Sequence, residues 1–402
     1  MEITNPSVTK LNKSEGSKVL IYLLVFLFTI HITPATYINS SFLEQFLGSG
    51  QVGFVFSVAS VLLLLVFSII YKILNKVGNF KTFITFLTLD LISLIILSTS
   101  LIFSGEIWGW IFIATYIVGF ISRSVAFLNI DIFMEHFSSD SDTGGIRGIF
   151  LTCLNFAFIL GPLIAGLIVT DVVDAGKIYL LSSILLIPVF VISIYYFRKF
   201  KDSKYEHGDF LKTIKKVGRN KNLFNIFGTN FILRFFYSWM VIYTPIFLLK
   251  YIGFSLGEVA LITGISLVPF VIFQIPLGKI ADRVLGEKEI LITGFIIMSI
   301  ATGSIAFFDV HSFWFWVSIL FVTRIGASAV EVMTETYLFK KIDDDDVNII
   351  SLYRSVRPMA YIISPIIASM VLVFFEINSL FFILSIVLLS GTYFAYRLKD
   401  TL

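Results

Sequence analysis

Acidic and basic side chains interrupt the long apolar runs of this 402-residue chain, and they are the residues best suited to chemistry. Asp90 lies ten residues, or about 15 Å of helix, into an apolar run that begins near Phe80. If that run crosses a membrane, a charge at this depth costs roughly 3 kcal/mol, so its presence requires a reason. We expect Asp90 either to bind and release protons or to be a structural acid paired with a basic neighbour or a helix terminus.

A second set of charges forms a stripe within residues 313–339. Arg324, Ser328, Glu331 and Glu335 follow the spacing i, i+4, i+7 and i+11, which places them on one face of a helix. Arg324 and Glu331 either take part in proton coupling or neutralise each other. Residues 108–134 repeat the stripe less regularly, and His31, one turn before Pro34, is either a coupling imidazole or a hydrogen-bonded structural histidine. The candidates for proton coupling, in which binding and release of a proton drives another process, are therefore Asp90, Asp131, Glu331, Arg123, Arg324 and His31.

Two further deep cations, Arg234 and Arg357, are expected either to bind an anionic substrate or to balance the acids. Four deep arginines against three deep acids do not indicate a substrate charge. Polar and aromatic residues of the same runs either line a cavity or serve packing and lipid contact. The candidates for a substrate cavity are Tyr37, Asn39, Ser40, Arg234, Tyr237, Trp239, Tyr243, Arg357 and Tyr361.

The composition indicates an integral membrane protein, because 57% of the residues are hydrophobic, only 14% are charged, and the mean hydropathy is +0.92. Lipid offers backbone groups no partners, so continuous runs of this length predict helices. Twelve runs are long enough to cross a bilayer core of about 30 Å at about 1.5 Å per residue: 19–43, 52–74, 82–103, 108–134, 149–170, 178–197, 223–249, 259–281, 290–308, 313–339, 349–375 and 379–396.

The distribution of lysine and arginine predicts the orientation. With a cytoplasmic N-terminus, Lys177 and Lys250 are the only basic residues outside, whereas the outer loops hold acids such as Glu106 and Asp309. This is the positive-inside pattern, so we expect both termini in the cytoplasm and a multi-pass protein of the plasma (cytoplasmic) membrane.

The chain is also duplicated. Six features of the first half recur 200–207 positions later, among them Trp108-x-Trp110 as Trp314-x-Trp316 and Arg123 as Arg324. We therefore predict an all-α protein of twelve transmembrane helices in two six-helix bundles. The expected parts are a cytoplasmic tail (1–17), an N-terminal bundle (18–199), a cytoplasmic linker (200–221) and a C-terminal bundle (222–402). Within the linker, residues 209–221 are either a plain connection or an amphipathic helix on the inner leaflet.

Other classes of function receive little support. The single cysteine, Cys153, lies in an apolar run, and the chain lacks metalloprotease, P-loop and nucleophile-elbow motifs. We expect no cofactor, no metal, no nucleic-acid partner, no enzymatic activity and a monomer in the lipid bilayer. A membrane-embedded enzyme would need polar catalytic groups converging near one membrane face. A receptor with a transporter fold would bind a ligand without flux.

One loop carries a family resemblance. Gly278-Lys279-Ile280-Ala281-Asp282-Arg283-Val284-Leu285-Gly286-Glu287-Lys288 resembles the motif G-x-x-x-D-R-x-G-R-K of the major facilitator superfamily of secondary transporters, with one inserted residue. In that family the acid helps lock the cytoplasmic gate. The equivalent loop of the first half keeps Lys76 and Gly78 but has Asn75 in place of the acid, which weakens the expectation of a charge-based lock there.

A second stretch, Gly161-Pro162-Leu163-Ile164-Ala165-Gly166, is similar to the G-P-x-x-G-G stretch found mainly in the family's antiporters. Small residues let a neighbouring helix approach closely, and proline removes one backbone hydrogen bond. Glu135 and Glu335 are expected to join gate networks with Arg147, Arg354 or Arg283. The expected gate or structural residues are Asn75, Lys76, Gly78, Glu135, Arg147, Gly161, Pro162, Gly166, Gly278, Asp282, Arg283, Gly286, Glu335 and Arg354.

The resemblance implies transport of a small molecule by alternating access, in which two bundles rock around a central site. Arg123 resembles an arginine of the fourth helix in proton-linked members, although the glutamine and glycine that follow it there are absent. Together with Asp90 and the Gly161-Pro162 stretch, it favours proton-coupled export of small amphipathic compounds. The alternative is proton-coupled uptake or facilitated transport of a metabolite such as a sugar, an amino acid or an organic anion.

Overall fold

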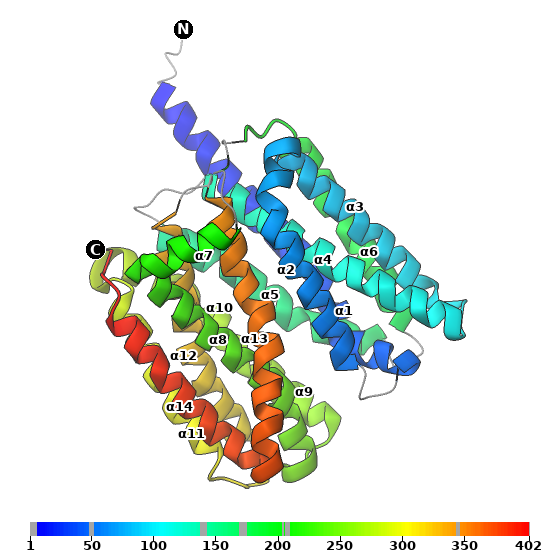
Figure 1. Cartoon of the computed structure of the whole chain (residues 1–402), viewed down its shortest axis with the longest axis vertical. Helices are drawn as coiled ribbons and strands as arrows, with labels where there is room; N and C mark the ends of the chain where they lie inside the picture. The colour runs from blue at the N-terminus through cyan, green and yellow to red at the C-terminus, as the bar shows by residue number, and fades with distance from the viewer. Residues whose placement is uncertain are drawn as a thin grey trace. The chain divides into compact units, whose positions relative to one another are not determined.

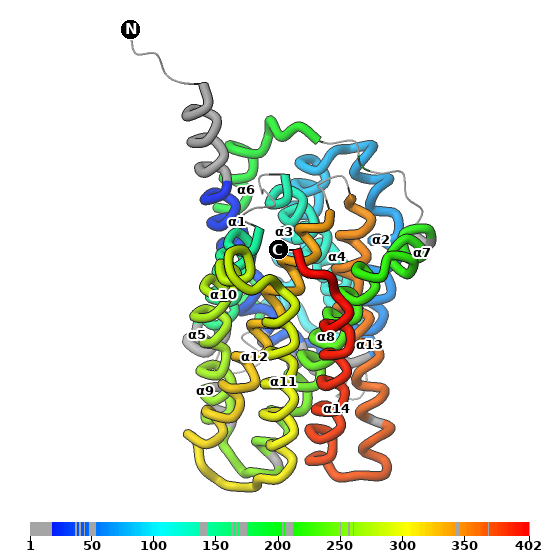
Figure 2. Tube along the Cα trace, turned by 90° about the vertical axis from the view of Figure 1, so that its left-hand side faces the viewer, coloured from blue at the N-terminus to red at the C-terminus, as the bar shows by residue number. Residues whose placement is uncertain are grey.

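The computed structural model describes residues 6–47, 52–136, 143–168, 175–202, 205, 210–342 and 346–401, and within these ranges all regular structure is helical. The helices are drawn in Figures 1 and 2. Those of the first half are α1 (Pro6–Leu47), α2 (Val52–Val77), α3 (Asn79–Ser98), α4 (Glu106–His136), α5 (Thr143–Ile168) and α6 (Ala175–Ile192). After α7 (Phe210–Arg219) follow α8 (Lys221–Phe247), α9 (Leu256–Ser266), α10 (Val268–Ile280), α11 (Lys288–Ile305), α12 (Phe313–Phe339), α13 (Val347–Phe374) and α14 (Ile377–Tyr396).

Eleven segments of the described residues are long and apolar enough to cross a membrane by length and composition. The predicted run 223–249 is the long helix α8, which is not among them, and its first half carries Asn225, Asn230 and Arg234. The predicted run 259–281 is divided into α9 and α10, because Pro269 at the start of α10 has no N–H to continue the preceding helix. Helix α1 begins at Pro6, earlier than the apolar run within it.

Contacts divide the chain into two compact units. The first comprises residues 1–139, 156–207 and 343–350, and the second comprises 140–155, 208–342 and 351–402. The first half of α5 therefore belongs to the second unit. The bundles 18–199 and 222–402 are predicted from the sequence repeat, whereas the two units are defined by contacts between residues. The bundle boundaries therefore stay a prediction.

In the first unit, α3 packs against α4 and α6, and α1 packs against α6 (Figure 1). The contact surfaces are apolar and aromatic, and Phe28, Phe42, Phe83 and Phe112 are almost fully buried. In the second unit, α11 packs against both α12 and α14 (Figures 1 and 2). A Cβ atom added to Gly326 of α12 would lie 2.5 Å from the carbonyl oxygen of Gly294 in α11, so these two helices need glycine at their crossing.

Residues 210–219 of the linker form a helix, α7, and its position on the inner leaflet stays a prediction. Helix α7 carries four basic residues, and the side chain of Ile214 is 44% exposed. Lys212, Lys215, Lys216 and Arg219 line one shallow depression together with Asn220. Asn220 also ends the linker, because its side chain accepts hydrogen bonds from the first backbone N–H groups of α8.

The two units repeat one capping device that the sequence analysis did not predict. Asp202, beyond the last helix of the first half, accepts a hydrogen bond from the backbone N–H of Asn79 at 2.6 Å, at the start of α3. Asp400, beyond α14, accepts one from the backbone N–H of Glu287 at 3.0 Å, at the start of α11. The capped turns contain Gly78 and Gly286, whose φ angles of 90° and 70° suit only glycine. Each carboxylate also complements the positive end of the helix that it caps.

We predict that Asp202→Ala and Asp400→Ala each lower the free energy of unfolding by about 1 kcal/mol, because each leaves backbone N–H groups without a partner. The measurement is the apparent melting temperature of the purified protein in detergent. Lys201→Ala and Lys399→Ala are matched controls, since these side chains are exposed and adjoin the capping residues. Equal melting temperatures for the aspartate and lysine variants would contradict the prediction.

Candidate functional site

The first unit contains a largely buried cluster of three charged or titratable side chains from three helices. Arg123 of α4 donates to Asp90 Oδ1 of α3 through Nη1 at 2.8 Å. Nε2 of His31, on α1, lies 3.0 Å from Asp90 Oδ2. Asp90 and His31 are completely buried, and the side chain of Arg123 is 11% exposed. The structure thus brings together three of the side chains singled out for proton coupling.

The surroundings fix the geometry of this cluster. The ring of Phe28 packs edge-on against His31 with centroids 5.0 Å apart. Gly119, one turn before Arg123, leaves room for the guanidinium, because a Cβ atom there would lie 3.2 Å from Nη1. His31 Nδ1 is buried and has no hydrogen-bond partner among the described residues. The imidazole therefore presents one nitrogen to Asp90 and keeps the other unused.

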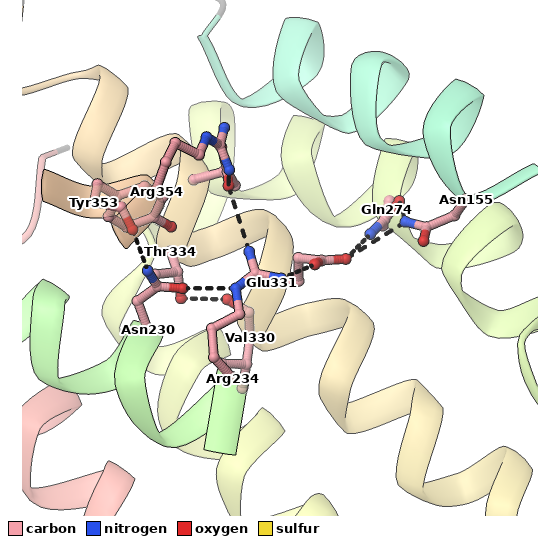
Figure 3. Close-up of polar contacts among 10 residues, drawn as sticks. Asn155, Asn230, Arg234, Gln274, Val330, Glu331, Thr334, Tyr353 and Arg354 are labelled. Atoms are coloured by element: carbon pink, nitrogen blue, oxygen red, sulfur yellow. Dashed lines mark hydrogen bonds and ion pairs between the residues drawn. The ribbon is translucent and has the colours of Figure 1, made fainter. Parts of the chain in front are cut away.

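The second unit has its own buried carboxylate, Glu331 of α12 (Figure 3). Arg234 of α8 donates to Glu331 Oε1 at 3.1 Å, and Gln274 of α10 donates to Oε2 at 3.0 Å. Asn155 of α5 donates to the side chains of both Gln274 and Glu331, at 3.1 and 3.4 Å. The expectation that Arg324 and Glu331 neutralise each other is therefore wrong, because the ion-pair partner of Glu331 is Arg234.

Glu335 lies one turn further along α12. Arg354 of α13 donates to its two oxygens at 2.7 and 2.9 Å, and Nη2 of Arg234 lies 3.7 Å from Oε1. The predicted network of Glu335 thus contains Arg354. Arg147 interacts electrostatically with Glu335 and lies over the ring of Phe339, 3.2 Å from its centroid.

The motif acid Asp282 lies in a π-helical turn, η6 (Ala281–Leu285), after α10. It accepts hydrogen bonds from the backbone N–H groups of Gly144 and Gly145, at the start of α5, at 3.1 and 2.8 Å. Lys340 bridges Asp282 and Glu287, with its Nζ 2.9 and 2.8 Å from their oxygens. Burial lowers the pKa of Lys340, but hydrogen bonds and electrostatic attraction from the two carboxylates outweigh it, so the pKa lies above its ordinary value. Lys340 therefore holds a full charge between them.

Glycine allows α5 to approach α10 closely. A Cβ atom on Gly144 would lie 2.5 Å from the carbonyl oxygen of Gly278, and one on Gly148 would lie 2.7 Å from that of Gln274. Gly144 and Gly148 were missed by the sequence analysis. Their signal is the small-x-x-x-small spacing of helix crossings in membranes.

Gly161, in the Gly-Pro stretch of α5, allows α1 to approach α5 closely. A Cβ atom on Gly161 would lie 2.4 Å from Cβ of Thr33, and Thr33 Oγ1 donates to the carbonyl oxygen of Ala157. The side chains at positions 162 and 166 lie outside the described part. In the second unit, α8 and α13 are also joined by a hydrogen bond, in which Trp239 Nε1 donates to the carbonyl oxygen of Ser364 at 2.7 Å.

The remaining predicted residues are dispersed. Asn39 accepts a hydrogen bond from Tyr179 at 2.9 Å, whereas the side chains of Tyr37 and Ser40 lie outside the described part. Tyr243 packs against Trp239 at 6.2 Å between ring centroids. Arg357 is exposed, with its guanidinium 5.9 Å from the centroid of the Tyr361 ring. Among the gate residues, Asn75 donates to the carbonyl oxygen of Tyr205, Lys76 and Arg283 are exposed, and Glu135 is buried. Asp131, a candidate for proton coupling, is also buried.

Comparison with known proteins identifies the class of protein that this architecture represents. The chain matches the Major Facilitator Superfamily over residues 19–255 and 226–401, which together cover nearly its whole length. It belongs to that family and is a multi-pass membrane protein that carries out secondary transport. No curated protein matches it.

Solved structures share this fold. The human organic anion transporter MFSD10 (TETRAN) has a TM-score of 0.75 and 14% identity, covering 95% of this chain and 99% of its own. The proton:xylose symporter XylE, bound to 6-bromo-6-deoxy-D-glucose, has a TM-score of 0.75 and 14% identity over 96% and 97%. A bacterial homologue of the iron transporter ferroportin has a TM-score of 0.74 and 10% identity over 94% and 97%. Identities this low establish the fold alone.

We predict that Arg234→Met lowers the free energy of unfolding by about 3 kcal/mol, because it leaves Glu331 buried without its cation. Adding Glu331→Leu to Arg234→Met should recover most of that loss, since no buried charge then remains at this position. Denaturation of the two variants and the parent in one detergent tests this. A double variant no more stable than Arg234→Met would contradict the assignment of the ion pair.

Proposed function

We propose that the protein is a proton-coupled exporter of small amphipathic compounds in which Asp90 carries the proton. The observation that supports this most directly is the complete burial of Asp90 between an imidazole and a guanidinium from two other helices. Because Asp90 contacts both His31 and Arg123, its protonation changes the contacts among α1, α3 and α4 at once.

Charge arithmetic gives the physical reason. With Asp90 ionised, His31 neutral and Arg123 charged, the cluster has no net charge. One added proton on Asp90 leaves a net charge of +1 and removes the ionic partner of Arg123. In a low-dielectric interior this change in charge is worth far more than in water. Protonation can therefore favour one arrangement of α1, α3 and α4 over another, which is what coupling between a proton and a cargo requires.

The direction of transport rests on α5. Its Gly161-Pro162 stretch resembles that of the family's antiporters, and Gly161 lies directly against Thr33 of α1. At the other end of the same helix, the backbone N–H groups of Gly144 and Gly145 donate hydrogen bonds to Asp282. In the proposed cycle these hydrogen bonds form a cytoplasmic gate and must break each time the two halves rock. Uptake of a metabolite is the alternative and uses the same proton site.

We further propose that the protein lies in the plasma membrane as a monomer with both termini in the cytoplasm, following the distribution of lysine and arginine. Labelling of single cysteines in a Cys153→Ser background tests the orientation. In intact cells, Ser104→Cys should react with a membrane-impermeant maleimide, and Lys201→Cys should react only after the cells are permeabilised. The reverse pattern would overturn this orientation.

The decisive prediction concerns Asp90→Asn. Purified protein is reconstituted into liposomes that contain a pH-sensitive dye, and lipophilic cations, sugars, amino acids and organic anions are added in turn. We expect the parent to move protons in response to at least one lipophilic compound and Asp90→Asn to lose that response at least tenfold. Because Asn keeps the shape and accepts hydrogen bonds through one oxygen, the variant is expected to fold.

His31→Gln is the matched control, because the glutamine amide can still donate to Asp90 but cannot titrate. Coupling that survives in His31→Gln and fails in Asp90→Asn supports the proposal. Unchanged coupling in Asp90→Asn removes Asp90 as the proton carrier. A response to polar metabolites alone would replace export by uptake.

A further inference from the structure

Arg324 of α12 is a buried guanidinium whose contacts do not account for its charge. The residue is 8% exposed. Among the described residues its one side-chain hydrogen bond is from Nη1 to Thr323 Oγ1 at a long 3.4 Å, and its guanidinium carbon lies 5.2 Å from the centroid of the Phe236 ring. Neither neighbour is an anion. Within the described part of the chain, no carboxylate lies within ion-pair distance of Arg324.

Three other arginines within the bundles behave differently. Each of the three donates to a carboxylate on another helix: Arg123 to Asp90 at 2.8 Å, Arg234 to Glu331 at 3.1 Å and Arg354 to Glu335 at 2.7 Å. In these three cases a carboxylate compensates the charge of the guanidinium. Leaving one uncompensated is costly, and an unpaired charge inside a membrane domain indicates a functional site.

The side chains near Arg324 are suited to an anion with an apolar body. Tyr237 of α8 and Tyr361 of α13 are both close enough to interact with it electrostatically. The Tyr237 hydroxyl is buried and has no hydrogen-bond partner among the described residues, so it is a second donor without an acceptor. The rings of Phe236 and Phe270 supply apolar surface, and the centroid of the Phe270 ring lies 6.1 Å from that of the Tyr237 ring.

We propose that Arg324, with the Tyr237 hydroxyl and Tyr361, binds the anionic group of the transported compound, which is a carboxylate, sulfonate or phosphate monoester on an apolar body. A planar guanidinium offers two parallel N–H donors to such a group, and a tyrosine hydroxyl can donate to a further oxygen. The proposal rests on the transport function above and narrows its cargo to amphipathic organic anions. It also moves the anion site away from Arg234, which Glu331 and Glu335 already occupy.

A stability measurement separates this role from a structural one without any ligand. We expect Arg324→Met to leave the apparent melting temperature of the ligand-free protein unchanged or raised, because it removes a charge that has no partner. Arg234→Met is the matched control and should lower it, since Glu331 loses its cation. A fall for Arg324→Met as large as that for Arg234→Met would overturn the proposal.

Equilibrium binding in detergent tests the chemistry directly. The probes are 1-naphthoate, naphthalene-2-sulfonate and 1-naphthyl phosphate, with 1-naphthalenemethanol as the uncharged and 1-naphthylmethylammonium as the cationic counterpart. We expect at least one anion to bind at least tenfold more tightly than the alcohol. Arg324→Gln should weaken that anion by about tenfold to a hundredfold, as expected for loss of a charge-assisted hydrogen bond, and Arg324→Lys by less.

Equal binding of anion and alcohol, no binding of any anion, or unchanged affinity in Arg324→Gln would each overturn the proposal. Because this measurement uses no proton gradient, it is independent of coupling. Anion binding that depends on Arg324 in a protein that moves no protons would refute only the proposed proton coupling. Proton movement driven by uncharged compounds would refute only the anion site.

Discussion

The cost of placing a charge in an apolar interior governs this structure. Each deep carboxylate with described partners is met by an arginine from another helix, as Asp90 is by Arg123 and Glu331 is by Arg234. Such pairs contribute little net stability compared with apolar packing, but breaking one is expensive. They therefore specify which helices must be neighbours, and they make the arrangement sensitive to any event that changes a charge, such as the arrival of a proton.

Duplication provides the frame in which these pairs sit, and the copies have diverged in their chemistry. Both copies retain the capping aspartate, Asp202 or Asp400, and the glycine turn that it closes. The loops themselves differ, because Asp282 accepts a hydrogen bond from the start of α5, whereas Asn75 donates to the carbonyl oxygen of Tyr205. Structural features are thus repeated where each half must fold, and charged features differ where the two halves take different roles.

The sequence predicted the membrane helices and marked the deep charges, because apolar runs and the charges within them can be recognised without tertiary structure. It could not predict which charges pair. Arg324 and Glu331 share a face of α12 but lie about two turns, or about 10 Å, apart along the axis. Arg234 approaches from α8 and takes the carboxylate instead. The glycines at the start of α5 and the Lys-Asp sequence that ends each half were visible in the sequence, yet their partners lie more than a hundred residues away.

The unpaired charge of Arg324 offers a way for cargo to drive movement. Arg234, Arg354 and Arg147 already share the acids Glu331 and Glu335, so no described carboxylate in this part of the protein is left for Arg324. Enclosing an uncompensated guanidinium more completely would raise its desolvation cost, which disfavours closure of the empty protein. A bound anion would cancel the charge and remove that cost. The cargo would then bind the closed arrangement better than the open one, and such differential affinity is what a ligand needs in order to shift a conformational equilibrium.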